Sequence, residues 1–286
     1  MGETPRKKIR EKGTLMNKIL CSTGALLVYG GDYRLLESLS EKLLYDGYEF
    51  MMDAPYYEEL ETLIHFLRGL RLYIPVVHCE KSIGEALSQT DASMLHSAYE
   101  KFEQNCSLSK SIGAEKMVLH LWDGRTSDAA FAHNLDHYDV LDQIAQNYHI
   151  NLCVENVVCT TDNPMEHFCA LRQRYPKIHF VFDTKMAAFH HQLELLYQKE
   201  YEWLWKNEHI CHYHINDYSG GYMDWEHLQS LPVGSGVIDF DVFFSFIKKI
   251  GYHNTLTVEA TAVRPDGTVD ISMLNEQFRR IQSYCR

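Results

Sequence analysis

Eight short runs of apolar residues recur along the 286-residue chain, and stretches with helical spacing separate them. The runs are rich in Val, Leu, Ile, Phe or Cys, which is typical of parallel strands covered on both faces. A strand that alternates with a helix eight times in roughly 250 residues is what a (β/α)8 barrel requires. The predicted strands lie at about residues 18–25, 47–54, 73–80, 116–122, 150–156, 179–184, 210–217 and 255–260.

A doubly wound open sheet is the main competing arrangement. Such a sheet normally carries a glycine-rich phosphate loop after its first strand, and TGALLVYGGD at 23–32 matches neither G-x-G-x-x-G nor a P-loop. We therefore predict an α/β fold, a single-domain (β/α)8 TIM barrel over residues 17–286, after a flexible basic leader at residues 1–16. The longer connections at about 81–115 and 218–254 are predicted to be lid or loop elaborations.

Composition restricts the compartment and the partners. No apolar run approaches the roughly 18 residues that a membrane span needs, and the first residues lack the apolar core of a secretory signal. The eight cysteines include no C-x-x-C pair, so we expect reduced thiols and a cytoplasmic protein. A formal charge of −12 does not favour nucleic-acid binding, which depends on neutralising phosphates. A homo-oligomer is compatible with the sequence.

Six of the predicted strands carry a carboxylate or an imidazole near the C-terminal end. The residues concerned are His78 and Glu80, His120, Glu155 and Asn156, Asp183, His212 and His214, and Glu259. In a barrel these ends meet on one face, where active sites are built. An isolated buried carboxylate is costly, so each of these groups needs a partner, a metal or a shifted pKa. We therefore predict one convergent site.

Four consecutive strands supply the strongest candidates for a metal site, namely Glu155, Asp183, His214 and Glu259. Three carboxylates and one imidazole suit a single divalent cation of borderline hardness, which is Zn, Mn, Co or Mg. The alternative is an ion-pair cluster with Lys and Arg. Only Lys185 lies close in sequence to any of these strand ends, so we favour the metal site.

Several segments, taken in order, resemble those of one known family. They are the pair EN at 155–156, FDTK at 182–185, HYHIND at 212–217, LPVGSGVIDF at 231–240, GY at 251–252 and VEA at 258–260. These segments are similar to the xylose isomerase-like TIM barrel superfamily and most of all to its sugar phosphate isomerase/epimerase group. The resemblance covers the chain from about residue 18 to its end and is densest after residue 116.

The resemblance implies roles for individual residues. The shared metal ligands of the family fall on the same four positions, and His78 and His120 match histidines that contact substrate. In the apurinic endonucleases of the superfamily these histidines bind further zinc ions. Another endonuclease ligand falls on Met186, which breaks the three-metal pattern. Asp224 and His227 resemble a further endonuclease zinc pair and keep that alternative open.

Three more residues are candidates for contact with substrate. Lys185 either holds a substrate oxygen or phosphate or is a solvated lysine at the barrel mouth. His212, two residues before His214, is a further candidate, although its depth in the barrel favours a role in the core or behind a ligand. Asp217 either orients an imidazole near the substrate or caps the loop that follows.

The leading functional hypothesis is a metal-dependent sugar or sugar phosphate isomerase or epimerase. The cation would stabilise the enediolate that forms when a proton leaves the carbon next to a carbonyl. Glu155 and Glu259 are the predicted acid and base. The alternatives are a zinc-dependent apurinic endonuclease-like phosphodiesterase and a metal-binding barrel without catalysis.

Overall fold

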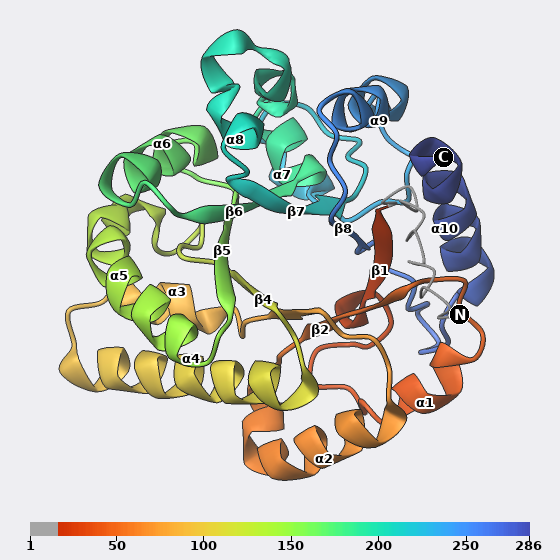
Figure 1. The fold of residues 1–286 in the computed structure, drawn as a ribbon, viewed down its shortest axis with the longest axis horizontal. Helices are drawn as coiled ribbons and strands as arrows, with labels where there is room; N and C mark the ends of the chain where they lie inside the picture. The colour runs from red at the N-terminus through yellow and green to blue at the C-terminus, as the bar shows by residue number, and fades with distance from the viewer. Residues whose placement is uncertain (1–16) are drawn as a thin grey trace, which may run out of the picture.

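The computed structural model describes residues 17–286 and shows eight parallel strands that close into a barrel surrounded by helices (Figure 1). The strands follow one another around the ring in sequence order, and β8 pairs with β1 to close it. They are β1 (Lys18–Ser22), β2 (Gly47–Met51), β3 (Val76–His78), β4 (Lys116–Leu119), β5 (Asn151–Glu155), β6 (His179–Asp183), β7 (Ile210–Ile215) and β8 (Thr255–Val258). Each strand lies inside one of the eight predicted runs, so the predicted TIM barrel is confirmed. The predicted leader at residues 1–16 lies outside the described residues.

The helices form the outer layer of the barrel. They are α1 (Leu35–Ser40), α2 (Leu60–Leu70), α3 (Ser82–Leu87), α4 (Ala92–Ile112), α5 (Phe131–Asn147), α6 (Pro164–Arg174), α7 (Thr184–Phe189), α8 (Trp203–Lys206), α9 (Phe240–Lys249) and α10 (Ile271–Cys285). None of these helices, within residues 17–286, is both long and apolar enough to cross a membrane.

The prediction of a lid or loop at 81–115 is wrong, because this connection consists mainly of α3 and α4. The Asp91 side chain begins α4 by accepting hydrogen bonds from the N–H groups of Ser93 and Met94. Gly113, with φ of 81°, ends it in the left-handed conformation that glycine adopts without strain. The connection at 218–254 is a loop up to Asp239 and then the helix α9.

Helix α9 illustrates how the sequence produces the outer layer. Its buried residues Phe240, Phe243, Phe244 and Ile247 recur at helical spacing and form one apolar face. The Asp239 side chain caps the first turn by accepting from the N–H of Val242 at 3.0 Å. The apolar face packs on the barrel, so the helix is fixed by burial of aromatic side chains.

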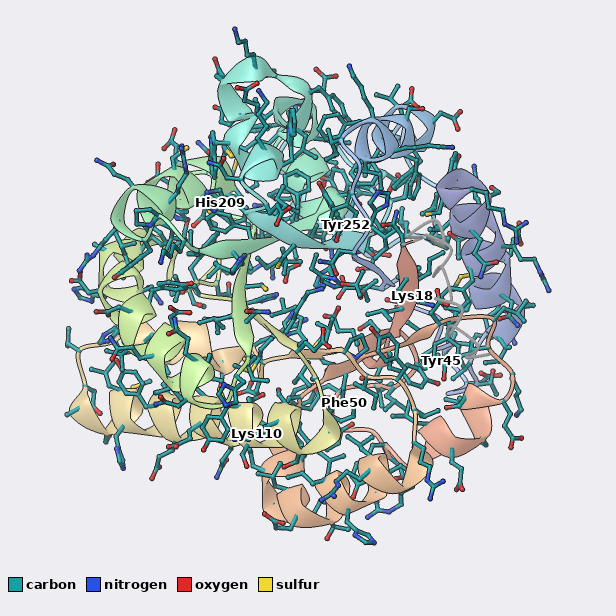
Figure 2. All side chains as sticks on the ribbon, in the orientation of Figure 1. Lys18, Tyr45, Phe50, Lys110, His209 and Tyr252 are labelled. Carbon is teal, nitrogen blue, oxygen red and sulfur yellow. The ribbon has the colours of Figure 1, made fainter. Side chains whose placement is uncertain are left out.

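Side chains fill the centre of the barrel, which is therefore a packed core and not a pore (Figure 2). Below the C-terminal mouth, five strands contribute an apolar cluster of Leu20, Val76, Val118, Cys153 and Val181. Because strand residues alternate between faces, residues two positions later point into the same interior. On four of these strands the later residues are His78, His120, Glu155 and Asp183. Glu49 and His212 pair with Val76 and Val181 at the level of this cluster, so the interior is part apolar and part polar there and polar at the C-terminal mouth.

Candidate metal centre

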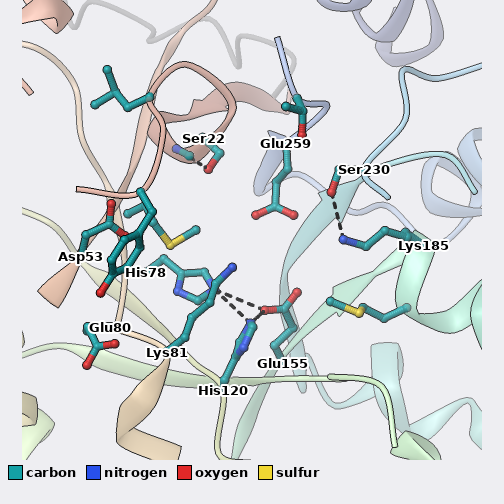
Figure 3. A pocket seen from close by; sticks show the side chains of 16 residues that line it. Ser22, Asp53, His78, Glu80, Lys81, His120, Glu155, Lys185, Ser230 and Glu259 are labelled. Atoms are coloured by element: carbon teal, nitrogen blue, oxygen red, sulfur yellow. Dashed lines mark hydrogen bonds and ion pairs between the residues drawn. The ribbon is translucent and has the colours of Figure 1, made fainter. Parts of the chain in front are cut away.

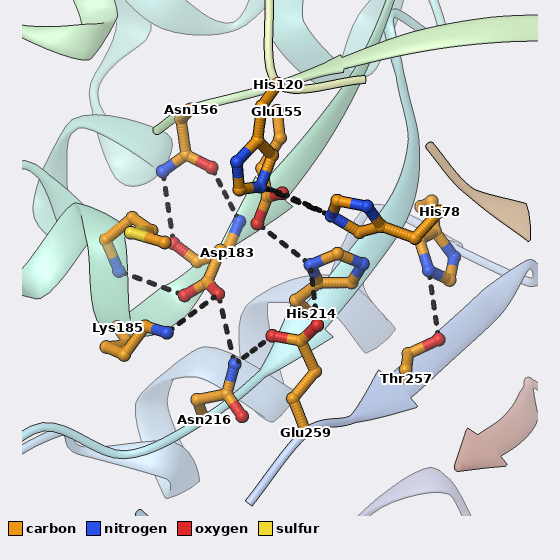
Figure 4. A network of polar contacts seen from close by, with 12 residues as sticks. His78, His120, Glu155, Asn156, Asp183, Lys185, His214, Asn216, Thr257 and Glu259 are labelled. Carbon is orange, nitrogen blue, oxygen red and sulfur yellow. Dashed lines mark hydrogen bonds and ion pairs between the residues drawn. The ribbon is translucent and has the colours of Figure 1, made fainter. Parts of the chain in front are cut away.

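Donor atoms from three consecutive strands meet at the C-terminal mouth of the barrel (Figure 4). Glu155 on β5, Asp183 on β6 and His214 on β7 bring their donor atoms within 4.8 Å of one another. The Nδ1 atom of His214 lies 2.9 Å from Glu155 Oε1. Glu259, the residue after β8, places its Oε1 3.6 Å from the same nitrogen. The three predicted carboxylate ligands therefore lie around the imidazole of the fourth, His214.

Two asparagines hold these carboxylates in place. Asn216 donates from Nδ2 to Asp183 Oδ2 at 3.0 Å and to Glu259 Oε2 at 2.9 Å, so one amide joins two strands. Asn156 accepts from the backbone N–H of Asp183 at 2.6 Å and donates to its carbonyl at 3.1 Å. The sequence signals for these roles are the strand alternation that puts Asn216 on the face of His214, and the position of Asn156 directly after Glu155.

The cluster carries more negative charge than the side chains around it balance. Burial raises the pKa of Asp183 to about 6, and the Glu155 and Glu259 carboxylates add to this effect while Lys185 opposes it. Burial also lowers the pKa of His214, but the surrounding carboxylates outweigh burial and hold this pKa well above its usual value. Carboxylates packed this closely need a cation. Three carboxylates and one imidazole suit a divalent ion, so the residues present fit one.

A cavity of about 260 Å³ opens above this cluster (Figure 3). Glu155 and Glu259 reach it from different sides, and the Glu259 side chain is 14% exposed against 2% for Glu155. The other candidates that line the cavity are His78, His120 and Lys185. The cavity is therefore small, of mixed polar and apolar lining, and bordered by the two carboxylates predicted to act as acid and base.

His78 and His120 form a second convergent group with Glu155. His78 Nδ1 lies 2.8 Å from the carbonyl of Cys79, to which it donates, and its Nε2 points to the centre. That Nε2 lies 3.2 Å from His120 Nε2 and 3.4 Å from Glu155 Oε2. His120 Nε2 is 2.7 Å from the same oxygen, and burial lowers the pKa of His120 to about 4. The His120 ring is thus available as a neutral donor and acceptor.

Lys185 and Met186 both line the cavity. Lys185 Nζ donates to Ser230 Oγ at 2.9 Å and lies 3.8 Å from Asp183 Oδ2. Asp224 and His227 instead lie in the loop after β7, where His227 Nδ1 is 2.7 Å from Asp224 Oδ2 and the imidazole is largely exposed. Neither is among the cavity-lining residues of the described chain.

Neither the His212 nor the Asp217 side chain lines the cavity, and both lie where their other predicted roles, in the core or behind a ligand and as a loop cap, would place them. His212 is fully buried below it and bonds to Glu49 and Thr255 at 2.8 and 2.6 Å. Both oxygens of Asp217 accept from backbone N–H groups of the loop that follows β7. The donors are Tyr218, Gly234, Gly236 and Ile238. Asp217 therefore caps this loop, which is one of its two predicted roles.

Glu49, in the middle of β2, is a buried carboxylate beside the site that the sequence analysis did not predict. It is fully buried and lies beneath the ligands, in contact with His212 and His214. The signal in the sequence is a single Glu inside the apolar strand GYEFM. Such a group needs partners, but its partners lie more than 160 residues away in the chain.

Comparisons with known proteins agree with this architecture. The model of the xylose isomerase-like TIM barrel family matches residues 39–277. No curated protein sequence matches the chain. A D-tagatose 3-epimerase-like protein has a TM-score of 0.70 at 17% identity, with 93% of this chain and 96% of that chain covered.

Two further solved structures are similar over nearly their whole length. The IOLI protein with bound zinc has a TM-score of 0.71 at 18% identity, with 94% of this chain and 99% of that chain covered. D-allulose 3-epimerase from Methylomonas sp., in complex with D-allulose, has a TM-score of 0.69 at 15% identity, with 94% and 97% covered. At these identities the likeness concerns the fold. Because the family model covers most of its length, the chain belongs to the xylose isomerase-like TIM barrel family.

Proposed function

We propose that this protein is a divalent-metal-dependent isomerase or epimerase of a small sugar or sugar phosphate. The observation that carries the proposal is the pair of carboxylates, Glu155 and Glu259, that face one small cavity above Asp183 and His214. The similarity to structures described as 3-epimerases supports a sugar substrate, and the zinc in a similar barrel supports a metal.

Glu155, Asp183, His214 and Glu259 would hold the ion. When bound, a divalent cation polarises the carbonyl oxygen and the neighbouring hydroxyl oxygen of the sugar, and so acidifies the carbon that carries the hydroxyl. Glu259, the more open of the two glutamates, takes the proton from that carbon, which leaves an enediolate. Glu155, which is ionised at rest, takes up a proton from solvent and delivers it to the opposite face of the same carbon, which inverts that carbon, and Glu259 releases its own proton to solvent. A proton delivered instead to the neighbouring carbon, together with transfer of the hydroxyl proton from one oxygen to the other, completes an isomerisation.

The other cavity residues orient the sugar. His78 and His120 offer imidazole nitrogens beside Glu155, and the lowered pKa of His120 keeps that ring neutral. Lys185 keeps its charge because the Asp183, Glu259 and Glu155 carboxylates raise its pKa against the effect of burial. Its ammonium group lies at the wall of the cavity, where it binds a hydroxyl or phosphate oxygen of the substrate.

A panel of ketoses, aldoses and their phosphates tests this function. The protein loaded in turn with Zn²⁺, Mn²⁺, Co²⁺ and Mg²⁺ is incubated with each sugar, and the products are separated by chromatography. We expect metal-dependent interconversion of at least one pair of sugars, and the phosphate dependence identifies the role of Lys185. A protein that binds metal but converts none of the sugars would favour the barrel without catalysis.

A zinc-dependent phosphodiesterase is the second candidate, and the group of His78, His120 and Glu155 favours it as a second set of ligands. Met186 and the formal charge of −12 count against it.

Metal content separates the two candidates. We predict about one tightly held divalent ion per chain, because three carboxylates that need a cation surround His214, whereas His78 and His120 share the single carboxylate of Glu155. Elemental analysis after dialysis measures this ratio. Two or three equivalents of zinc, together with cleavage of an abasic duplex, would favour the phosphodiesterase.

A further inference from the structure

Glu49 lies at the centre of the barrel, beneath the candidate ligands, and has no contact with solvent. Its two oxygens lie 3.0 and 3.2 Å from His214 Nε2. His212 Nε2 is 2.8 Å away and Thr257 Oγ1 is 2.7 Å away. A buried carboxylate is stable only where several donors solvate its charge, and these three groups do so from two other strands. Glu49 takes no part in the chemistry proposed above.

The tautomer of each ring follows from its neighbours. His214 Nδ1 faces Glu155 and Glu259, while its Nε2 faces Glu49. An imidazole that gives its Nδ1 lone pair to a metal keeps one proton on Nε2, and the nearby acceptor for that proton is Glu49. His212 can accept at Nδ1 from the Thr255 hydroxyl at 2.6 Å and donate from Nε2 to Glu49. With a metal ion on Nδ1 of His214, neutral rings and an ionised Glu49 satisfy the contacts of both histidines with Glu49.

We propose that Glu49 is a positioning residue of the metal centre: by accepting the Nε2 proton of His214, it holds the ring with its Nδ1 lone pair toward the other three ligands. The proposal rests on the metal centre of the proposed function. A carboxylate behind a ligating histidine fixes the ring and raises its basicity, and loss of such a partner costs about 10-fold to 100-fold in metal affinity.

A second metal ion between Glu49, His212 and His214 is the competing interpretation, since their donor atoms also lie within 4.8 Å of one another. Such an ion would displace the imidazole protons that now bond to Glu49. His214 would then have to bridge two ions as an imidazolate. The Thr257 hydroxyl also donates to Glu49, and Glu49 and His212 are fully buried beneath the candidate ligands, where neither lines the cavity. The hydrogen-bonded arrangement is therefore favoured.

Glu49→Gln tests the positioning role. The Gln carbonyl can still accept from His214, and its amide can donate to His212 once that ring carries its proton on Nδ1 and donates to Thr255. The variant is therefore expected to fold, with loss of the negative charge only. We expect the dissociation constant for Zn²⁺ or Co²⁺, measured by chelator competition, to rise about 10-fold to 100-fold. The absorption bands of bound Co²⁺ should shift, because His214 becomes a weaker ligand.

The matched control is Thr257→Val, which removes one donor to Glu49 but keeps the carboxylate behind His214. We expect this variant to change metal affinity and the Co²⁺ spectrum much less. A measurement on the wild type is independent of folding in the variants: in the Zn²⁺ form, ¹⁵N NMR should find His214 protonated on Nε2. An unprotonated Nε2 overturns the proposal.

The outcomes separate this proposal from the proposed function. A Glu49→Gln protein with wild-type metal affinity and Co²⁺ spectrum would refute the positioning role and leave the sugar chemistry intact. The predicted loss of affinity in a protein that converts no sugar would support positioning and refute the function. Loss of one of two bound ions would make Glu49 a ligand, which contradicts the proposal. A wild type that binds no divalent ion would overturn both.

Discussion

Glu259→Gln should lower turnover by about 10²-fold to 10⁴-fold at saturating metal, the loss ascribed to removal of a general acid or base. Gln keeps the shape of the side chain and an oxygen that can accept from Asn216, but it loses the charge and the capacity to take up a proton near neutral pH. The barrel should remain folded, because the side chain lies at the mouth and is 14% exposed. Turnover and metal occupancy must be measured on the same preparation.

Glu80→Gln is the matched control for this prediction. Glu80 lines the same cavity, but its carboxylate accepts from Ser82 and pairs with Lys101 at 3.3 Å, at the side of the cavity formed by the end of β3. The same change of charge there should reduce turnover far less. A Glu259→Gln protein that works at the wild-type rate would show that the acid or base lies elsewhere, with Glu155 the next candidate and His120 after it.

Asp183→Asn should abolish activity mainly through loss of metal. Asp183 accepts from the Met186 N–H through Oδ1 and from Asn216 through Oδ2, so the Asn variant can keep the first bond but meets another amide donor at the second. The substitution also removes the negative charge of a side chain that is proposed to bind the metal directly. We therefore expect metal affinity to fall by more than about 10²-fold, the upper end of what loss of an outer partner costs.

The two variants separate binding from proton transfer. Excess metal should restore part of the turnover of the Asp183→Asn variant. It should not restore the turnover of the Glu259→Gln variant. Metal dissociation constants from chelator competition, compared with turnover at stoichiometric and excess metal, give this distinction. An Asp183→Asn protein that holds its metal as tightly as the wild type would remove Asp183 from the ligand set.

The barrel and the place of its site could be predicted because both follow from local patterns. On β4, β5 and β6 an apolar residue is followed two positions later by His120, Glu155 and Asp183, and strand alternation alone puts these polar groups inside the barrel. The topology of parallel strands then brings their C-terminal ends to one face.

The partners of a buried residue could not be predicted in the same way. The position of His212 two residues before His214 predicts that it lies one layer deeper, but its contact with Glu49 depends on how β7 faces β2 across the barrel. The contact between Glu49 and His214 could not be predicted either, because it exists only where β2 and β7 face each other across the barrel. The capping role of Asp217 depends on a loop that returns to its carboxylate at Gly234 and Gly236. Each of these roles is set by contacts between distant parts of the chain.

The most direct test of the account is deuterium incorporation from solvent. The metal-loaded protein is incubated in D₂O with the sugars that it interconverts, and the products are examined by NMR. If Glu259 and Glu155 carry the proton to and from carbon, deuterium should appear at the carbon next to the carbonyl, and Glu259→Gln should slow its appearance together with turnover. Interconversion without any solvent deuterium at carbon would point to a direct hydride shift and contradict the account.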